Sequence, residues 1–203
     1  EDVRDLVAGL TPADTFYRIE KVDGKTKNDG AWMNFPTVSL FSSTANADMT
    51  DLFKKLGCEA STNAYSIEGS TPLVDSLFSI RYGLYSWNQG ANPLLTLAGQ
   101  EGDTWLYRKE YTLPLGFGIS MDLEDNWQLD LGNPADVQND LCTVLGTPWV
   151  LEEVYGEDGG GTDAYTGEAE ADYYAYITNR QAKKVKVAWG EESTTYDNVN
   201  RGY

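Results

Sequence analysis

The sequence contains no histidine, and this absence narrows the chemistry that the chain can perform. Histidine is the commonest general base near neutral pH and a frequent metal ligand. Without it, a Ser–His or Cys–His catalytic arrangement is excluded. The sequence also lacks any run of about 18–20 apolar residues, which is the length that a membrane-spanning helix requires. Neither catalytic machinery of these kinds nor a membrane span is therefore expected within these residues.

Cysteine is scarce as well, since only Cys58 and Cys142 are present. Two cysteines without histidine do not make a four-ligand zinc site, so we predict no metal and no cofactor. An extracytoplasmic location would permit a disulfide. However, Cys58 follows Gly57, where a helix is expected to end, and Cys142 falls inside another predicted helix. We therefore predict two independent thiols that pack as small hydrophobic side chains.

Basic residues are outnumbered by acidic ones. The 15 Lys and Arg residues stand against 32 Asp and Glu residues, which gives a formal net charge of −17. Nucleic-acid binding depends on basic patches, so nucleic acid is excluded as a partner. Docking on an anionic membrane surface through basic side chains is excluded for the same reason.

Helix and strand patterns alternate along the chain up to about residue 150. Apolar residues recur at helical spacing in residues 2–10, 48–56, 72–80 and 134–145. Strand patterns fall at residues 15–22, 37–42, 81–87, 105–107 and 116–121. This alternation predicts an α/β domain over residues 1–150, a mixed sheet flanked by helices, with an α+β fold as the alternative. The predicted core residues are Phe41, Leu52, Phe53, Leu77 and Leu141.

The composition changes after residue 150. Residues 151–172 are rich in glycine and acid, and they are interpreted as a loop. Residues 173–203 then read as a β-strand segment, with strands predicted at 173–178 and 184–189. Two strands alone are marginally stable. We therefore interpret this segment as part of a truncated β-domain or as an extension packed on the first domain.

No cluster of acidic residues qualifies as catalytic. Asp122, Glu124, Asp125 and Asp130 are close in sequence, but a solvated loop explains them, and their spacing is not that of a calcium loop. The glycines at 159–161 are interpreted as a linker, because the strand and the Lys–Ser/Thr pair of a phosphate-binding loop are missing. No catalytic residue is assigned.

Aromatic side chains and one loop are the best candidates for ligand contacts. Sugar rings can stack on the side chains of Trp32, Tyr85, Trp87, Trp105 and Tyr107, although packing in the core is the alternative.

The loop at 42–46 joins a predicted buried strand to a helix N-terminus, where backbone amides favour a phosphate. We expect it at the C-terminal edge of the sheet, with simple helix capping as the alternative. The candidate substrate-binding residues are Trp32, Ser42, Ser43 and Asn46.

Four apolar-rich blocks follow one another in a fixed order. They are residues 16–20 (FYRIE), 38–57 (VSLFSSTANADMTDLFKKLG), 77–85 (LFSIRYGLY) and 109–120 (KEYTLPLGFGIS). In order and spacing, over roughly residues 14–150, these blocks resemble the extracytoplasmic part of the bacterial YfhO-type membrane proteins, which look like GT-C glycosyltransferases. The residues that carry the resemblance are 16–20, 40–43, 46, 56–57, 77, 80–82 and 113–117.

The resemblance implies a soluble extracytoplasmic domain of a multi-spanning membrane protein, on the extracellular face of the bacterial cell membrane. Such proteins look like transferases that take a sugar from a polyprenyl-phosphate donor to glycosylate cell-envelope polymers such as teichoic acid. The implied partners are the membrane-embedded remainder of the parent chain, the donor and the glycan acceptor. The catalytic residues would lie outside these residues, so the isolated chain is expected to catalyse nothing. The alternative is a surface carbohydrate-binding or structural interaction module without catalysis.

Overall fold

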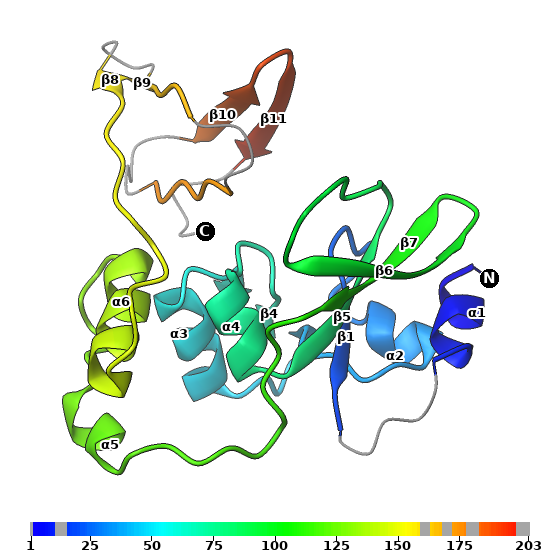
Figure 1. Cartoon of the computed structure of the whole chain (residues 1–203), viewed down its shortest axis with the longest axis horizontal. Helices are drawn as coiled ribbons and strands as arrows, with labels where there is room; N and C mark the ends of the chain where they lie inside the picture. The colour runs from blue at the N-terminus through cyan, green and yellow to red at the C-terminus, as the bar shows by residue number, and fades with distance from the viewer. Residues whose placement is uncertain (1, 11–15, 159–162, 168–171, 178–182, 198–203) are drawn as a thin grey trace.

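The computed structural model describes residues 2–10, 16–158, 163–167, 172–177 and 183–197. Its centre is a four-stranded sheet with the strand order β1–β5–β7–β6 (Figure 1). These strands are β1 (Arg18–Lys21), β5 (Ile80–Tyr85), β6 (Leu95–Glu101) and β7 (Thr104–Lys109). β1 and β5 are parallel, whereas β7 is antiparallel to both β5 and β6. The predicted mixed sheet flanked by helices is therefore confirmed.

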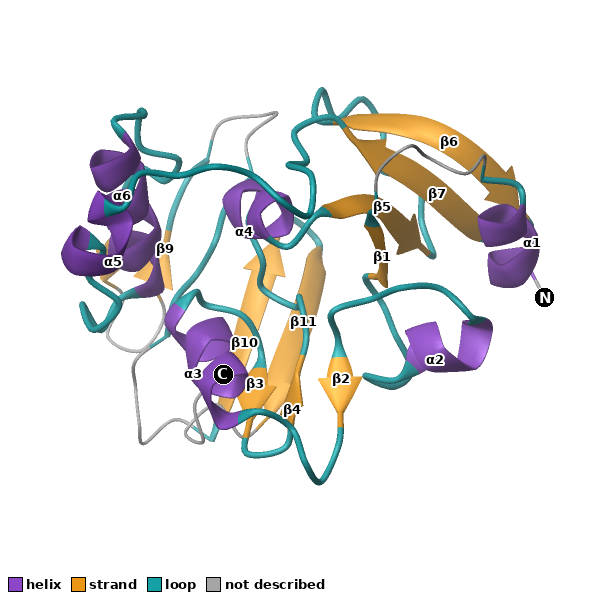
Figure 2. Cartoon of the chain, turned by 90° about the horizontal axis from the view of Figure 1, so that it is seen from below, coloured by secondary structure: helices purple, strands orange, loops and turns teal. Residues whose placement is uncertain are grey.

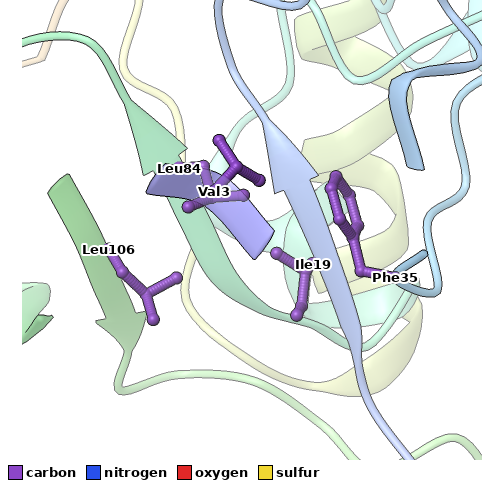
Figure 3. Close-up of a cluster of buried hydrophobic side chains, with 5 residues drawn as sticks. All are labelled: Val3, Ile19, Phe35, Leu84 and Leu106. Carbon is purple, nitrogen blue, oxygen red and sulfur yellow. The ribbon is translucent and has the colours of Figure 1, made fainter. Parts of the chain in front are cut away.

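The first hydrophobic core lies on one face of this sheet. Figure 3 shows its five buried side chains, which are Val3, Ile19, Phe35, Leu84 and Leu106. Helix α1 (Asp2–Ala8) supplies Val3 and packs on β6 and β7, and α2 (Asp29–Met33) packs on β1. Leu84 and Leu106 are direct cross-strand partners, so both point to the same face. The helical periodicity at the N-terminus thus places an apolar stripe against the sheet.

A second core forms among three helices. Its buried residues are Phe53, Leu56, Cys58, Val74 and Val137. They come from or adjoin α3 (Ala47–Lys55), α4 (Pro72–Leu77) and α6 (Pro134–Leu145). The Phe53 ring lies 4.8 Å from the Tyr65 ring and 4.8 Å from the Phe78 ring, measured between centroids. A small antiparallel sheet of β2 (Leu40–Phe41), β4 (Ala64–Tyr65) and β3 (Ala60–Ser61) lies beside α3.

The ends of these helices follow from their capping residues. The side chains of Asn46, Thr71 and Asn133 accept hydrogen bonds from backbone amides in the first turns of α3, α4 and α6. Gly57 follows α3 with a φ of +85°, and a Cβ at this position would lie 2.9 Å from the Cβ of Pro134. Only glycine combines this left-handed backbone with such a close approach. The sequence signals for helix start and stop are confirmed here.

The remaining elements are short. Helix α5 (Asp122–Asn126) precedes α6, and Figure 2 shows α3, α5 and α6 grouped on one side of the molecule and α1 and α2 on the other. β8 (Glu157–Asp158) pairs with β9 (Asp163–Ala164). β10 (Lys184–Trp189) forms a two-stranded antiparallel sheet with β11 (Glu192–Asp197). The strand predicted at 184–189 is confirmed, as is the short β segment after the main domain.

Several sequence-based predictions were wrong. The buried strand expected at 37–42 is limited to the two residues of β2. Phe41 is 54% exposed and does not lie in the core. Within the described residues, β2 is a two-residue strand paired with β4, and its Phe41 side chain faces solvent. Leu52 and Leu77 are half-buried, whereas Phe53 and Leu141 are fully buried as predicted.

Two predicted strands do not form, and six real ones were missed, of which β6 and β11 are the longest. Residues 116–121 and 173–177 form no strand, and Thr178 lies outside the described residues. β6 escaped prediction because a register shift between Leu97 and Gly99 breaks its alternation. β11 escaped because all its residues are exposed, which leaves no apolar face to recognise.

Glu20 is a buried carboxylate that ties β1 to the segment before β2. Its Oε1 accepts hydrogen bonds from the Thr37 hydroxyl and from the backbone amides of Val38 (2.5 Å) and Ser39 (3.1 Å). Its Oε2 accepts one from the Ser39 hydroxyl at 2.9 Å. Burial raises the pKa of Glu20 above its ordinary value of 4.5, and these hydrogen bonds only partly offset that effect.

Among the described residues, no helix combines the length and the apolar character that crossing a bilayer requires. The domain boundaries at residues 150 and 172 remain predictions.

Replacing Phe53 by alanine should lower the free energy of unfolding by about 3–5 kcal/mol, because the ring is fully buried and its loss leaves a cavity. Denaturant melts would measure this loss. Phe41→Ala is the matched control, since its ring is largely exposed and its removal should cost less than about 1 kcal/mol. Equal losses in the two variants would contradict the assignment of the second core.

Glu20 should make the stability of the protein depend on pH. Because its pKa is raised in the folded state, the folded state binds the proton more tightly than the unfolded state does. Its contribution to stability is therefore lost as the pH rises from 4.5 through the folded-state pKa. Urea melts at increasing pH from 4.5 upward should show wild type losing stability relative to Glu20→Gln. A constant difference between the two proteins would refute this.

Candidate functional site

A cavity of about 360 Å³ opens between α4, the loop after β5, the end of β7 and residues 172–174. We call it the tyrosine pocket. It is lined by Val22, residues 67–72, Asp75, Tyr85, Gln89, Asn92, Leu94, Leu95, Lys109, Tyr111 and residues 172–174. Its residues come from five separate stretches of the chain, so only the fold assembles it.

The floor of the pocket is a buried ion pair between Asp75 and Lys109. The two side chains are only 7% and 3% exposed. The carboxylate of Asp75 also accepts hydrogen bonds from the Ser70 hydroxyl at 2.8 Å and from the Tyr111 hydroxyl at 3.4 Å. Because these donors occupy the carboxylate, Asp75 is a fixed polar anchor and not a free general base.

The position of Asp75 follows from the local sequence. Thr71 caps α4 and Pro72 occupies its first turn, so Asp75 lies in that turn near the positive end of the helix. The Thr71 hydroxyl hydrogen-bonds to Oε1 of Gln138, whose Nε2 donates to the carbonyl oxygen of Leu56 at 2.9 Å. These contacts hold α4 against α3 and α6 and set the orientation of the pocket floor.

Three tyrosine hydroxyls around this floor are held in their neutral form. Burial raises the pKa of Tyr85 and of Tyr111, and the negative charge of Asp75 adds to the effect. Partial burial, together with Asp172 and Asp75, raises the pKa of Tyr174 to about 12. Neutral phenols both donate and accept hydrogen bonds. The pocket therefore presents uncharged groups suited to hydroxyl-rich ligands.

An aromatic wall supports Tyr85. Its ring makes edge contacts with Trp87 and Tyr107, each at a centroid distance of 5.7 Å. Gly83 makes this arrangement possible, because a Cβ there would lie 2.6 Å from the Tyr85 ring. The Tyr107 hydroxyl donates to Oδ1 of Asn88 at 2.9 Å and accepts from the amide of Gln89 at 3.1 Å. The wall thus orders the loop that follows β5.

Gln89 leaves one polar group unsatisfied at the pocket. Its side-chain Nε2 is buried and has no hydrogen-bond partner within the described part of the chain. A buried donor without a partner costs free energy, and a ligand that supplies an acceptor removes that cost. This atom is therefore a candidate hydrogen-bond donor to a ligand oxygen.

A second cavity of about 330 Å³ lies between β1, the loop after it and residues 66–68. Its charged side chains already have hydrogen-bond or ion-pair partners within the chain. Lys27 hydrogen-bonds to Glu59 and to the Ser66 hydroxyl and forms an ion pair with Glu68 at 3.6 Å. The tyrosine pocket, with its unsatisfied donor, is the better candidate for a ligand site.

The candidate residues from the sequence lie outside both cavities. Trp32 is on α2 with 83% of its surface exposed, and Ser42, Ser43 and Asn46 form the turn before α3. The Asn46 side chain accepts from the amide of Met49 at 3.0 Å, so it acts as a helix cap. Their role in binding a substrate stays a prediction.

The expected position of the 42–46 loop was wrong. It follows β2 in the small antiparallel sheet, whereas the parallel strands β1 and β5 belong to the main sheet. The argument from the carboxyl ends of parallel strands therefore does not apply to it.

Some of the aromatic residues singled out from the sequence lie at the tyrosine pocket. Tyr85 lines it, and Trp87 and Tyr107, also singled out as possible sugar contacts, pack against Tyr85. Asp75 and Lys109 were missed, because they lie 34 positions apart and no local motif links them. Lys109 stands between Arg108 and Glu110 at the end of β7, so the local sequence did not single it out.

The other candidate groups behave as structural features. Cys58 and Cys142 are free and buried, which confirms two independent thiols, and burial raises the pKa of Cys58 to about 12. The acidic residues at 122–125 form the exposed helix α5 instead of a loop. No group of His, Cys, Asp or Glu that could hold a metal occurs among the described residues, and the glycines at 159–161 lie outside them.

Lys109→Met should destabilise the protein by about 3–5 kcal/mol, because it leaves the buried Asp75 carboxylate without its counter-charge. The double variant Asp75→Asn with Lys109→Met should recover much of that loss in denaturant melts. Arg108→Met is the matched control on the neighbouring residue, since its ion pair with Glu110 is exposed and contributes little. A double variant as unstable as Lys109→Met alone would argue against a coupled pair.

Comparisons with known proteins agree with the resemblance seen in the sequence. The family model "Bacterial membrane protein YfhO" matches residues 2–201. No curated protein and no solved structure gives a significant match. The match spans nearly the whole chain, so the mixed sheet, the ion pair and the tyrosine pocket all lie within the matched residues. The chain therefore belongs to the YfhO family of bacterial membrane proteins.

Proposed function

We propose that this chain is the extracytoplasmic part of a membrane glycosyltransferase of the GT-C type and that the tyrosine pocket binds one sugar unit of its substrate. The observation that carries the proposal is the unsatisfied Nε2 of Gln89, a residue that lines the pocket together with Tyr85, Tyr111 and Tyr174. Sugar hydroxyls and ring oxygens accept such hydrogen bonds, and aromatic rings pack on the apolar faces of sugars.

The size and charge of the pocket support a small, uncharged unit. A volume of about 360 Å³ is at the lower end of the range for ligand pockets, which favours one or two sugar rings over a longer glycan. Asp172 and Glu68 at its rim disfavour an anionic group. The pocket is therefore proposed for the sugar itself and not for a phosphate.

The wider activity rests on the family resemblance. The donor is proposed to be a polyprenyl-phosphate sugar, and the acceptor a cell-envelope polymer of the teichoic-acid type on the extracellular face of the membrane. The partner of this chain would then be the membrane-embedded remainder of its parent. The reacting groups are proposed to lie in that remainder, because Asp75 is already engaged by Lys109, Ser70 and Tyr111.

A surface carbohydrate-binding or structural module without catalysis is the second candidate. The fully paired carboxylate of Asp75 favours it, since a binding site needs no free acid or base. Both candidates predict sugar binding in the tyrosine pocket, and only the transferase predicts that the pocket affects sugar transfer.

The isolated chain should bind simple sugars with a Kd in the millimolar range, which corresponds to roughly −4 kcal/mol, because only part of the substrate contacts it. Ligand-observed NMR with a panel of monosaccharides would detect this binding, and Gln89→Ala should abolish it. Transfer assays on the whole membrane protein should then show a loss of about three- to tenfold for Tyr111→Phe and Tyr174→Phe, each of which removes one hydrogen bond.

Tyr155→Phe is the matched control, since this tyrosine is 79% exposed and lies outside the pocket. Ser43→Ala and Trp32→Ala test the earlier candidate residues in the same assay. Wild-type transfer in the pocket variants with reduced transfer in Ser43→Ala would move the site to the 42–46 loop. Sugar binding without any transfer activity would favour the binding module.

A further inference from the structure

The connection between β7 and α5 exposes a row of apolar side chains. Leu113, Leu115, Phe117, Ile119 and Met121 are each between 36% and 82% exposed. They alternate with proline, glycine and serine, so no bulky polar side chain separates them. Single exposed apolar residues are common, but a contiguous set of this kind marks an interaction surface. We call residues 113–121 the apolar loop.

The apolar loop stands off from the rest of the molecule. Figure 1 shows the chain running along the lower edge of the molecule before it reaches α5. At Gly116 and Gly118, no atom beyond the adjoining residues of the described chain comes within 4 Å of the position that a Cβ would occupy. These side chains are therefore available to a partner outside the chain.

The apolar loop also lies in an uncharged stretch of an otherwise acidic protein. Residues 111–121 carry no charged side chain, whereas the whole chain has a formal net charge of −17. Glu110 and Asp122 flank the gap on both sides. An uncharged stretch is what burial in a low-dielectric medium requires, because every buried charge would cost several kcal/mol.

We propose that the apolar loop inserts into the interfacial region of a lipid bilayer. The chain belongs to a membrane-protein family, so a bilayer is the surface beside which it works. Apolar side chains on a surface element bury about 5–10 Å into the boundary between headgroups and acyl chains. A protein-binding surface would instead be enriched in Trp, Tyr and Arg, and residues 113–121 contain none of these.

The lipid chemistry follows from the charge of the chain. With no basic side chain in the loop and an acidic surface around it, the attraction is apolar and an anionic bilayer opposes it. Binding should thus be strongest on zwitterionic lipid, weaker on anionic lipid, and partly restored on anionic lipid by salt. This inference does not depend on the tyrosine pocket, because none of residues 113–121 lines it.

A single labelled cysteine tests the proposal. Met121→Cys carries an environment-sensitive fluorophore, and the two native cysteines are buried and resist labelling. With phosphatidylcholine vesicles at millimolar lipid, its emission should shift to the blue, and a quencher attached to the lipid chains should reach it. Ser193→Cys is the control probe, because it lies in the exposed β10–β11 region, which Figure 1 places at the opposite end of the molecule.

Two substitutions test which side chains insert. Phe117→Asp should lower the vesicle partition coefficient about tenfold or more, since one buried apolar side chain is lost and a charge is added. Val187→Ser is the matched control, because it removes an exposed apolar side chain elsewhere and should leave partitioning unchanged.

The vesicle measurements distinguish insertion of the apolar loop from its absence. A blue shift at position 121 alone, lost in the variant with Phe117→Asp, supports insertion of the loop. No shift with zwitterionic vesicles, an equal shift at both probe positions, or unchanged partitioning of Phe117→Asp would each overturn the proposal. Because the probe measurement uses the loop with Phe117 intact, it decides the question even if the Phe117→Asp variant folds poorly.

Discussion

The architecture depends on the buried ion pair between Asp75 and Lys109. Lys109 ends β7, a strand of the main sheet, and Asp75 belongs to α4, a helix of the second core. The pair therefore connects the two hydrophobic clusters of the chain. Removing two charges from water costs several kcal/mol per ion, so the pair persists only because each charge neutralises the other and Ser70 and Tyr111 complete the hydrogen bonds.

The same interaction connects the fold to the proposed function. Tyr85 and Tyr111 are neutral at physiological pH, as phenols ordinarily are, and burial beside the negative charge of Asp75 raises their pKa further. We propose that this site, with its tyrosine hydroxyls, its aromatic rings and the unsatisfied amide of Gln89, recognises a sugar. The proposed division of labour, with recognition in this chain and chemistry in the membrane-embedded remainder, is consistent with this equipment. The apolar loop would add a second attachment to the membrane and limit how the pocket can face it.

Local signals predicted the helices well and the strands unevenly. Asn46, Thr71 and Asn133 cap their helices, and a cap depends on residues within one turn, which local sequence can indicate. The strands β1, β5 and β7 were recognised from their alternation. The exposed strand β11 and the shifted strand β6 were not, since burial on one face is what creates the alternating pattern. Residues 116–121 were wrongly predicted to form a strand, because their apolar side chains suggested a buried face although they are exposed.

The sequence by itself determined the family, the mixed α/β character, the capped helices and the absence of histidine-based chemistry. Each of these depends on composition or on neighbours along the chain. Only the tertiary structure decided where the candidate site lies. Asp75, Lys109 and Tyr111 carry no shared motif, and their proximity results from the packing of α4 against β5 and the pairing of β5 with β7. Likewise, the sequence could not show that Phe41 is exposed or that residues 113–121 lack a covering layer, because burial is a property of the assembled chain.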